Sequence, residues 1–391
     1  MKKILFVIHS MDFGGSERSL VNLLNELPDD KYSVDILMFQ KRGRLLAQLP
    51  KWVNVLETPN DLNRLYAPIG KAGTKLGVKV IGTLCARFAR KTRKSRAAYR
   101  WKHFYCPSIR MLPQQYDVAV AYGGAALVYF VSDRVCADKK LIWIHTDYRT
   151  GKYSAEDDRP YFAAADGIVS ISKACVDVLK EEFPEFQDKI FCIENITSAT
   201  LLRKQADEFE PEEYSKESSV HLLSVGRLVK EKGFDMAIEA AAILKKRGLR
   251  FHWFVLGDGC ERKELEKQIH QMGVEDCFTL LGGRSNPYPY IKHCTALIQT
   301  SRFEGKSVVL DEAKVLETPI VATDYLTVRD QITEGKEGYI VQMTPHAIAD
   351  GIMKLMSSKV HIEEIRSYLS AHSYGNEKEI TKYMDLFDKE I

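Results

Sequence analysis

Two glutamates that are eight residues apart, Glu304 and Glu312, lie where an expected strand over 296–300 passes into an expected helix. Glu304 falls in the loop after the strand, and Glu312 falls about one and a half turns into the helix. The amides at the start of that helix, over residues 306–309, are free to bind an anion. Carboxylates accept hydrogen bonds from sugar hydroxyls but are poor ligands for phosphate. The segment therefore predicts a site for a nucleotide sugar, and the alternative is two solvated acids on an ordinary helix.

A second expected strand ends at Val225 and is followed by a glycine and then three cations within six residues. Arg227 offers a planar fork of donors and Lys232 offers a point charge, so the two together can clamp a diphosphate. A solvated loop would explain Lys230 equally well. It explains less well why the Gly226-Arg227 step stands directly at the end of a strand.

Two more turns follow expected strands. Gly14 and Gly15 lie between a strand over 3–9 and a helix, where glycine lets the backbone approach a ligand. Their pattern is not G-x-G-x-x-G, which argues against a dinucleotide site, and a tight turn capped by Ser16 is the alternative. Gly257, in a Gly-Asp-Gly turn, is more simply structural.

His145 ends another expected strand and is a candidate to hydrogen-bond a substrate, although single histidines are usually satisfied within a core.

The elements that must position these residues follow one pattern, in which short β-branched runs alternate with helical segments. This alternation is typical of parallel α/β sheets. A polar, acidic stretch over 203–219 interrupts it and is the best candidate for a linker. We therefore expect two Rossmann-like α/β domains that face each other across a cleft, because ligands of such sheets bind beyond the carboxyl ends of the strands.

The composition is that of a soluble globular protein, with 45% hydrophobic and 28% charged residues in a chain of 391. No apolar run approaches the roughly 18–20 residues that cross a bilayer, and the N-terminus lacks the cleavage site of a signal peptide. The eight cysteines form no C-x-x-C pair. We expect reduced thiols in a cytoplasmic protein.

The net charge of +3 hides a strong asymmetry, because residues 62–116 contain thirteen lysines and arginines and no acid. The rest of the chain therefore carries a net charge of −10. Such a segment predicts an anionic partner, which is a lipid headgroup, a phosphorylated substrate or a nucleic acid. No nucleic-acid recognition motif accompanies the charge, so we expect no nucleic-acid binding.

Taken together, these residues resemble glycosyltransferase family 4, whose members are retaining enzymes with the GT-B fold and nucleotide-sugar donors. The resemblance extends over nearly the whole chain and rests on the segments 14–18, 145–147, 164–179, 226–233 and 257–259 and on the Glu304–Glu312 pair. The chain departs from the family at Gly305-Lys306-Ser307, where the family has Gly-Phe/Leu-Pro/Gly. It departs again at Glu194-Asn195, where a Pro-Asn-Gly turn is usual.

The resemblance implies an acceptor-binding domain over 1–200, a nucleotide-sugar-binding domain over 201–373, and a helix over 374–391 that packs back on the first domain. It also implies a role for each matching residue. The expected catalytic residues are His145, near the anomeric carbon of the donor sugar, Arg227 and Lys232 on the diphosphate, and Glu304 on the sugar hydroxyls. Glu312 would bind ribose, and the remaining donor contacts would come from Gly15, Gly226, Gly257, Gly305, Lys306, Ser307 and Val308.

The expected chemistry needs no metal and no cofactor, because no two aspartates stand two residues apart and the D-x-D metal motif is therefore missing. The charge on the leaving diphosphate would be met by Arg227, Lys232 and helix amides. An alternative is a glycosidase that uses Glu304 and Glu312 as acid and nucleophile. A glycosidase has no phosphate to bind, so this alternative does not explain the predicted phosphate-binding elements. Retention, as the family implies, would proceed by front-face attack in which the acceptor hydroxyl loses its proton to the leaving phosphate.

We therefore expect a hexosyltransferase or N-acetylhexosaminyltransferase that uses a UDP-sugar and a lipid-linked or glycan acceptor to build a surface polysaccharide or glycolipid. Over residues 71–110 the cations are joined by Trp101, Phe104 and Tyr105. This combination favours a cytoplasmic protein that is peripheral on the inner face of the plasma membrane, and the alternative is a solvated basic helix. The rival functions are a sugar-nucleotide epimerase of the same layout and a catalytically silent partner subunit.

Overall fold

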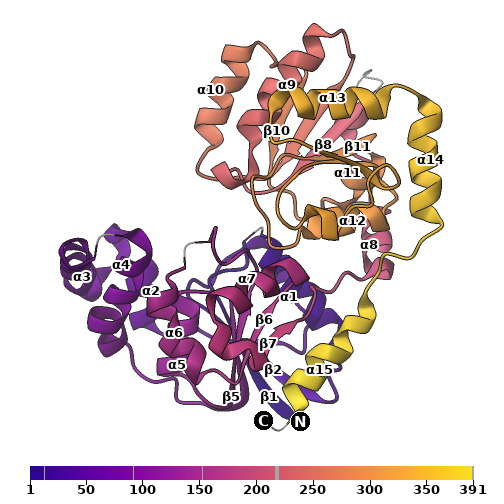
Figure 1. The fold of residues 1–391 in the computed structure, drawn as a ribbon. Helices are drawn as coiled ribbons and strands as arrows, with labels where there is room; N and C mark the ends of the chain where they lie inside the picture. Colours follow the sequence, from indigo (N-terminus) through magenta and orange to yellow (C-terminus); the bar gives the residue numbers. More distant parts are fainter. Residues whose placement is uncertain (13, 91, 152, 216–219, 390–391) are drawn as a thin grey trace. The chain divides into compact units, whose positions relative to one another are not determined.

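The computed structural model describes residues 1–12, 14–90, 92–151, 153–215 and 220–389. The chain divides into two compact units (Figure 1). Unit 1 comprises Met1–Asp12, Ser16–Asn195 and Glu379–Ile391, and unit 2 comprises Phe13–Gly15 and Ile196–Lys378.

Unit 1 is built on a parallel sheet of seven strands in the order β3-β2-β1-β4-β5-β6-β7. The central strand β1 is continuously apolar from Ile4 to Ile8, and these residues are at most 2% exposed because helices cover both faces of a parallel sheet. The strands are β1 (Lys2–Ile8), β2 (Tyr32–Met38), β3 (Asn54–Val55), β4 (Gln115–Tyr122), β5 (Cys136–Ile144), β6 (Gly167–Ser170) and β7 (Ile190–Cys192).

The last helix of the chain, α15, belongs to unit 1. Tyr383 stacks on Trp143 of the sheet with ring centroids 5.1 Å apart, and Lys139 donates a hydrogen bond to the backbone oxygen of Leu386. These contacts place α15 against the sheet of unit 1. The helices of this unit are α1 (Gly15–Glu26), α2 (Asn60–Tyr66), α3 (Leu76–Ala89), α4 (Arg93–Arg100), α5 (Ala126–Arg134), α6 (Ala155–Ala164), α7 (Lys173–Glu182) and α15 (Ile380–Asp388).

Unit 2 has a second parallel sheet, of six strands in the order β10-β9-β8-β11-β12-β13. The strands are β8 (His221–Val225), β9 (His252–Leu256), β10 (Phe278–Gly282), β11 (Ala296–Gln299), β12 (Ile320–Thr323) and β13 (Gly338–Val341). The helices are α8 (Ala199–Ala206), α9 (Phe234–Lys246), α10 (Arg262–Met272), α11 (Tyr288–His293), α12 (Val308–Val315), α13 (Pro345–Met356) and α14 (Lys359–Ser370). The predicted pair of parallel α/β sheets is confirmed.

The acidic stretch predicted as a linker lies inside unit 2 instead. Leu202 and Ala206 are one helical turn apart on α8 and are both buried in the core of the unit. Tyr214 packs on the same core, and its ring lies 5.2 Å from that of Phe254. The prediction is therefore wrong for residues 203–215, because a few apolar residues at the right spacing outweigh the polar composition. Residues 216–219 lie outside the described part of the chain.

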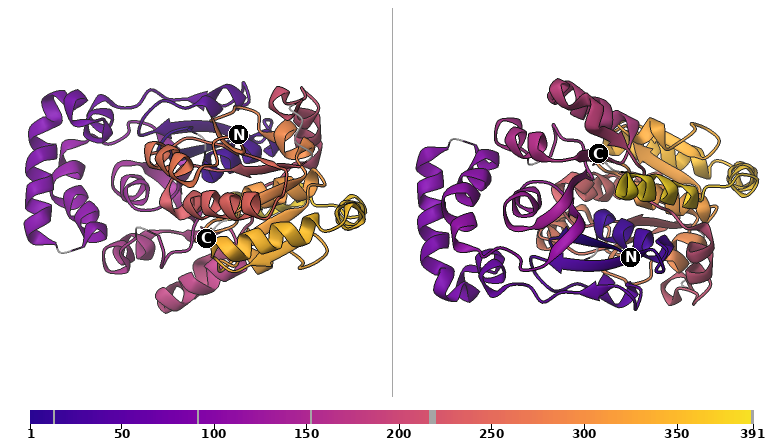
Figure 2. Two further views of the ribbon diagram at one scale, coloured as in Figure 1. Left: turned by 90° about the horizontal axis from the view of Figure 1, so that it is seen from above. Right: turned by 90° about the horizontal axis from the view of Figure 1, so that it is seen from below.

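The basic segment forms α3 and α4, which pack side by side at one end of unit 1 (Figure 2). Two of its expected interfacial aromatic residues are in the core instead, since Trp101 is 1% and Tyr105 is 5% exposed. The indole of Trp101 donates to Asp133, so this part of the prediction is wrong. Most of the segment's exposed apolar side chains lie on α3, namely Leu76, Val80, Ile81, Leu84 and Phe88, and Ile69 and Met111 are exposed outside that helix. No helix in the described residues is long and apolar enough to span a bilayer.

Candidate functional site

Most of the predicted donor-binding residues of unit 2 lie on loops at the carboxyl ends of its strands, and Val308 and Glu312 lie on α12. The two central strands of the sheet, β8 and β11, end at Val225 and Gln299. The connections of this sheet diverge at that point, which is where ligands of open parallel sheets bind. The loops after β8, β9 and β11 therefore bring together residues that are up to about eighty positions apart in the sequence.

Glycines allow these loops to pack closely. Gly257 has a φ of 153°, and a side chain there would collide with the carbonyl oxygen of Gly226. Gly233 has a left-handed φ of 65° and ends the single 3₁₀ turn Lys230–Lys232, and a side chain there would collide with the carbonyl oxygen of Thr300. Gly257 thus lets two backbones meet, and its contact with the donor stays a prediction.

Lys232 and Glu304 form the centre of the site. The ammonium of Lys232 forms an ion pair with Oε1 of Glu304, and the two side chains are only 21% and 15% exposed. The hydroxyl of Thr300 donates to the backbone oxygen of Lys232 at 2.9 Å, and the amide of Arg302 donates to that of Glu231 at 2.8 Å. The two loops are thus joined on both sides of the ion pair, which keeps both charges at one edge of the sheet.

The carboxylate of Glu304 is held by three donors on the same oxygen. Besides Lys232, Gln299 donates to Oε1 at 3.0 Å and Ser301 donates to it at 2.7 Å. The backbone oxygen of Glu304 accepts a hydrogen bond from Thr327 at 3.2 Å. Within the described residues, Oε2 of Glu304 has no hydrogen-bond partner, so this oxygen is available to a ligand hydroxyl.

Glu312 differs from Glu304 because it is completely buried, on α12. The hydroxyl of Tyr288 donates to its Oε1 at 3.2 Å. The two glutamates therefore have unequal environments, and Glu304 is the more accessible of the pair.

The loop that leads into α12 shows how the predicted amide donors are used. The amide of Ser307 donates to Oε1 of Gln331 at 2.7 Å. This contact corrects the prediction for Ser307, because a distant side chain already satisfies its amide. Lys306 lies 3.7 Å from Asp311 and is 11% exposed, so its charge is balanced within the protein. Val308 is the first residue of α12.

Arg227 is exposed at the end of β8. No carboxylate of the described residues pairs with its guanidinium, in contrast to the nearby Arg302, which binds Asp235 through two nitrogens at 2.9 and 2.6 Å. An exposed guanidinium on the loop that also carries the part-buried Lys232 is a ready binding group for an anion.

The remaining candidates are His145 of unit 1 and Gly15, which belongs to unit 2. His145 follows β5, its ring lies 4.4 Å from that of Tyr122, and neither ring nitrogen has a hydrogen-bond partner in the described residues. Burial lowers the pKa of His145 to about 3, so its imidazole is neutral at pH 7. Gly15 is exposed and is the first residue of α1. Ser16 therefore lies inside the helix, where its hydroxyl donates to Glu17, and it does not cap the turn.

Sequence reasoning missed the buried polar residues that support Glu304, which are Gln299, Ser301 and Gln331. The available signal was weak: Gln299 is the single polar residue in the strand sequence Ala-Leu-Ile-Gln. Their contacts depend on how three separate loops meet, which the local pattern does not contain.

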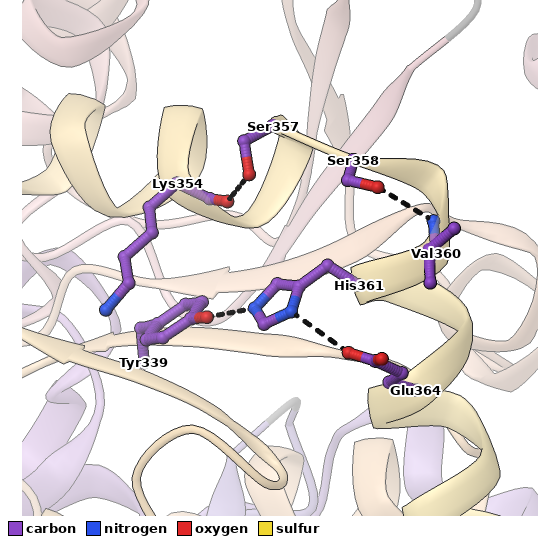
Figure 3. A pocket seen from close by; sticks show the side chains of 7 residues that line it. All are labelled: Tyr339, Lys354, Ser357, Ser358, Val360, His361 and Glu364. Atoms are coloured by element: carbon purple, nitrogen blue, oxygen red, sulfur yellow. Dashed lines mark hydrogen bonds and ion pairs between the residues drawn. The ribbon is translucent and has the colours of Figure 1, made fainter.

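A surface pocket elsewhere in unit 2 contains none of the predicted residues (Figure 3). It lies between β13, the end of α13 and the start of α14, and its side chains bond mainly with one another. His361 contacts the hydroxyl of Tyr339 and lies 3.4 Å from Glu364, while Ser358 accepts a hydrogen bond from the amide of Val360. The pocket therefore lies where α13 meets α14, and its polar side chains already have partners within it.

The match to a protein family covers most of unit 2. Residues 205–374 match the family model described as "Glycosyl transferases group 1". The alpha-D-kanosaminyltransferase of Streptomyces kanamyceticus is 34% identical over 149 residues, which are 37% of this chain and 38% of that protein. The poly(ribitol-phosphate) alpha-N-acetylglucosaminyltransferase of Staphylococcus aureus is 26% identical over 203 residues, 51% of this chain and 40% of that protein. The chain thus spans well under half the length of both relatives.

Other similarities cover the whole chain. An uncharacterized glycosyltransferase of Haemophilus influenzae is 23% identical over 98% of this chain and 99% of its own length. The structure of Anabaena HepE in complex with UDP-glucose superposes with a TM-score of 0.72 at 16% identity, over 99% of both chains. That of S. aureus TarM in complex with fondaparinux, alpha-GlcNAc-glycerol and UDP gives 0.71 at 16% identity, over 100% of both chains. The chain therefore has the fold of these proteins, which is the GT-B fold expected from the sequence.

Proposed function

We propose that this chain is a retaining glycosyltransferase of family 4 that transfers a sugar from a UDP-sugar to a lipid-linked or glycan acceptor. The observation that carries the proposal is that the Lys232–Glu304 ion pair and the exposed Arg227, which has no ion-pair partner in the described residues, all lie on loops at the carboxyl edge of the unit 2 sheet. The group 1 match over residues 205–374 contains all three residues. The transferase relatives and the UDP-bound structures support the reaction class and the donor.

The cations of the site fit the leaving group of such a reaction. As the bond between the anomeric carbon and the donor phosphate breaks, negative charge grows on the departing diphosphate. Arg227 and Lys232 stabilise that charge, together with the backbone amide of Val308, the first residue of α12. The proposal includes no metal and no cofactor. A lysine has three N–H donors, so Lys232 can bind phosphate while it remains in contact with Glu304.

The remaining steps need no protein nucleophile. Oε2 of Glu304 accepts a hydrogen bond from a hydroxyl of the donor sugar, and Glu312 binds the ribose. The acceptor hydroxyl attacks the anomeric carbon from the face that the diphosphate leaves, and its proton passes to the leaving phosphate oxygen. For His145 we propose a contact with the donor sugar as a neutral imidazole, and for Gly15 a contact with the phosphate.

The surface of α3 supports a membrane-bound acceptor. Leu84 is 48% and Phe88 is 90% exposed, and both lie beside the exposed Arg87 on the same helix. Apolar side chains next to cations are typical of segments that dock on anionic lipid, at about 1 kcal/mol per cation. We therefore propose that the protein acts in the cytoplasm on the inner face of the plasma membrane, through residues 71–110, in the synthesis of a surface polysaccharide or glycolipid.

The direct test is a panel of UDP-, GDP- and ADP-sugars, in which release of the nucleoside diphosphate is followed with and without membrane extracts that supply acceptors. We expect slow release from a UDP-sugar alone and much faster release when an acceptor is present. Full turnover without an acceptor would favour the epimerase. A protein that neither binds nor turns over any donor in calorimetry would be a silent partner subunit, and the proposal would be wrong.

A further inference from the structure

We propose that Gln299 and Gln331 are positioning residues that hold the carboxylate of Glu304 by one oxygen and reserve the other for the donor sugar. This inference rests on the proposed function and concerns how its central acid is oriented. Both glutamines are buried, at 9% and 3% exposure, and neither lies in the loop that carries Glu304. A buried glutamine needs hydrogen-bond partners at both ends of its amide to offset the cost of removing it from water.

The first part of the argument is the crowding of a single oxygen. Oε1 of Glu304 receives Lys232, Gln299 and Ser301 at once. A carboxylate oxygen accepts about two hydrogen bonds through its lone pairs, so Oε1 is saturated within the protein. A sugar hydroxyl that binds Glu304 must therefore use Oε2. Two of the three donors are neutral, so the orientation of the carboxylate does not depend on Lys232, which also binds the diphosphate.

The second part is the direction of the Gln299 amide. The hydroxyl of Ser307 donates to Oε1 of Gln299 at 2.8 Å. Because a glutamine has its acceptor and its donors at opposite ends of one rigid amide, fixing the oxygen on Ser307 turns the nitrogen toward Glu304. The same nitrogen also donates to Ser301 at 3.2 Å. Ser307 therefore determines which end of Gln299 meets the carboxylate.

The third part is the anchoring of Ser307 by Gln331. The side chain of Gln331 accepts from the amide of Ser307 at 2.7 Å and donates to its carbonyl oxygen at 2.8 Å. A serine that precedes a helix ordinarily uses its hydroxyl to cap that helix. Ser307 precedes α12 but makes no side-chain cap, and its hydroxyl goes to Gln299 instead. The chain Gln331–Ser307–Gln299–Glu304 is therefore continuous from the loop after β12 to the acid of the site.

The experiment compares Gln299→Leu with wild type in two measurements on the full chain. In calorimetry, the affinity of wild type for UDP-glucose should exceed its affinity for UDP, because Glu304 contacts the sugar. The variant should bind both ligands with equal affinity, and its affinity for UDP should stay within twofold of the wild-type value. In turnover of UDP-glucose, kcat should fall about tenfold, as expected for a lost hydrogen bond to a charged group. Thr318→Val is the matched control, since it removes another buried hydrogen bond of unit 2, to Ile291, at a distance from the site.

Three further variants separate positioning from packing. Gln331→Leu and Ser307→Ala should each lower kcat about threefold, because the amide of Gln299 then loses its fixed orientation. In Gln299→Glu, the introduced carboxyl can donate a proton to Glu304 only while it is protonated. Its activity relative to wild type should therefore be highest at low pH and fall as pH rises, when two carboxylates face each other. A role in packing alone predicts no such pH dependence.

The proposal is overturned if Gln299→Leu keeps kcat within twofold and still prefers UDP-glucose over UDP. It is also overturned if the relative activity of Gln299→Glu does not change with pH. A failure of the proposed function would be visible in the wild-type protein, which would then neither bind nor turn over a donor. A failure of the positioning role would be visible only in the variants, beside an active wild type and an active Thr318→Val control.

Discussion

The carboxyl edge of the unit 2 sheet and the outer face of α3 in unit 1 both carry cations, but they are built in opposite ways. At the sheet edge, Lys232 is 21% exposed, paired with Glu304 and held by backbone contacts from two loops. On α3, Arg87 is exposed, lies beside Phe88, and has no carboxylate partner in the described residues. The first arrangement fits one small ligand in a fixed geometry, because its groups are oriented before binding. The second fits a broad and adaptable anionic surface.

The strongest test of this contrast is Glu304→Ala. If the sheet edge is a preorganised donor site, removing the acid leaves Lys232 without its partner and the sugar without its acceptor. We expect turnover to fall about 100-fold or more, as when an oriented polar group is removed from an active site. Steady-state release of UDP from the preferred donor measures the loss. Turnover at the wild-type rate would show that the catalytic site lies elsewhere.

Arg227→Ala should have the next largest effect. Its guanidinium has no partner to lose in the described residues, so folding should be unchanged while the affinity for UDP falls about tenfold or more. Calorimetric titration with UDP measures the change. Arg302→Ala, which removes a cation of the loop after β11 together with its pair to Asp235 on α9, is the control for the loss of one positive charge. Equal losses in the two variants would contradict a specific role for Arg227.

The outer face of α3 is tested by Leu84→Glu combined with Phe88→Glu. We expect binding to vesicles that contain anionic lipid to fall about tenfold, while turnover of a soluble acceptor stays unchanged. Phe209→Glu is a matched control, because Phe209 is an exposed phenylalanine of unit 2, at 42% exposure. Co-sedimentation at low and high salt separates the contributions, since salt weakens the cationic part and spares the apolar part. Vesicle binding that survives the double substitution would contradict a docking role for α3.

The smallest expected effect concerns His145. Its ring is buried and uncharged at pH 7, whereas both regions compared above carry cations. Burial lowers its pKa from 6.5 in the unfolded chain to about 3 in the folded chain. The folded state therefore loses stability as pH falls from about 6.5 toward about 3, by up to about 1.4 kcal/mol per pH unit. His145→Gln should be less sensitive to acid over this window in urea unfolding at pH 7.0 and pH 5.5. An identical loss of stability in both proteins would show that His145 is protonated in the folded state.

Much of the architecture was predictable because it depends on local patterns. Continuous apolar runs such as Ile4–Ile8 are typical of buried parallel strands, and glycines directly after strands mark the turns at the carboxyl edge. The predictions failed where composition was used in place of spacing. Residues 203–215 are polar, yet Leu202 and Ala206 fasten α8 to the core, and Trp101 is buried although it follows a run of cations.

The sequence by itself determined the two parallel sheets, the position of Arg227 and Lys232 after a strand, and the spacing of Glu304 and Glu312. These features follow from the period of strands and helices and need no knowledge of distant contacts. Only the tertiary structure decided that Glu312 is buried while Glu304 keeps one oxygen available, and that Gln299 and Gln331 support it. The physical reason is that a side-chain hydrogen bond depends on atoms within about 3 Å. Gln331 meets Ser307 across 24 residues of sequence, and only the packing of β11, α12 and β12 brings them together.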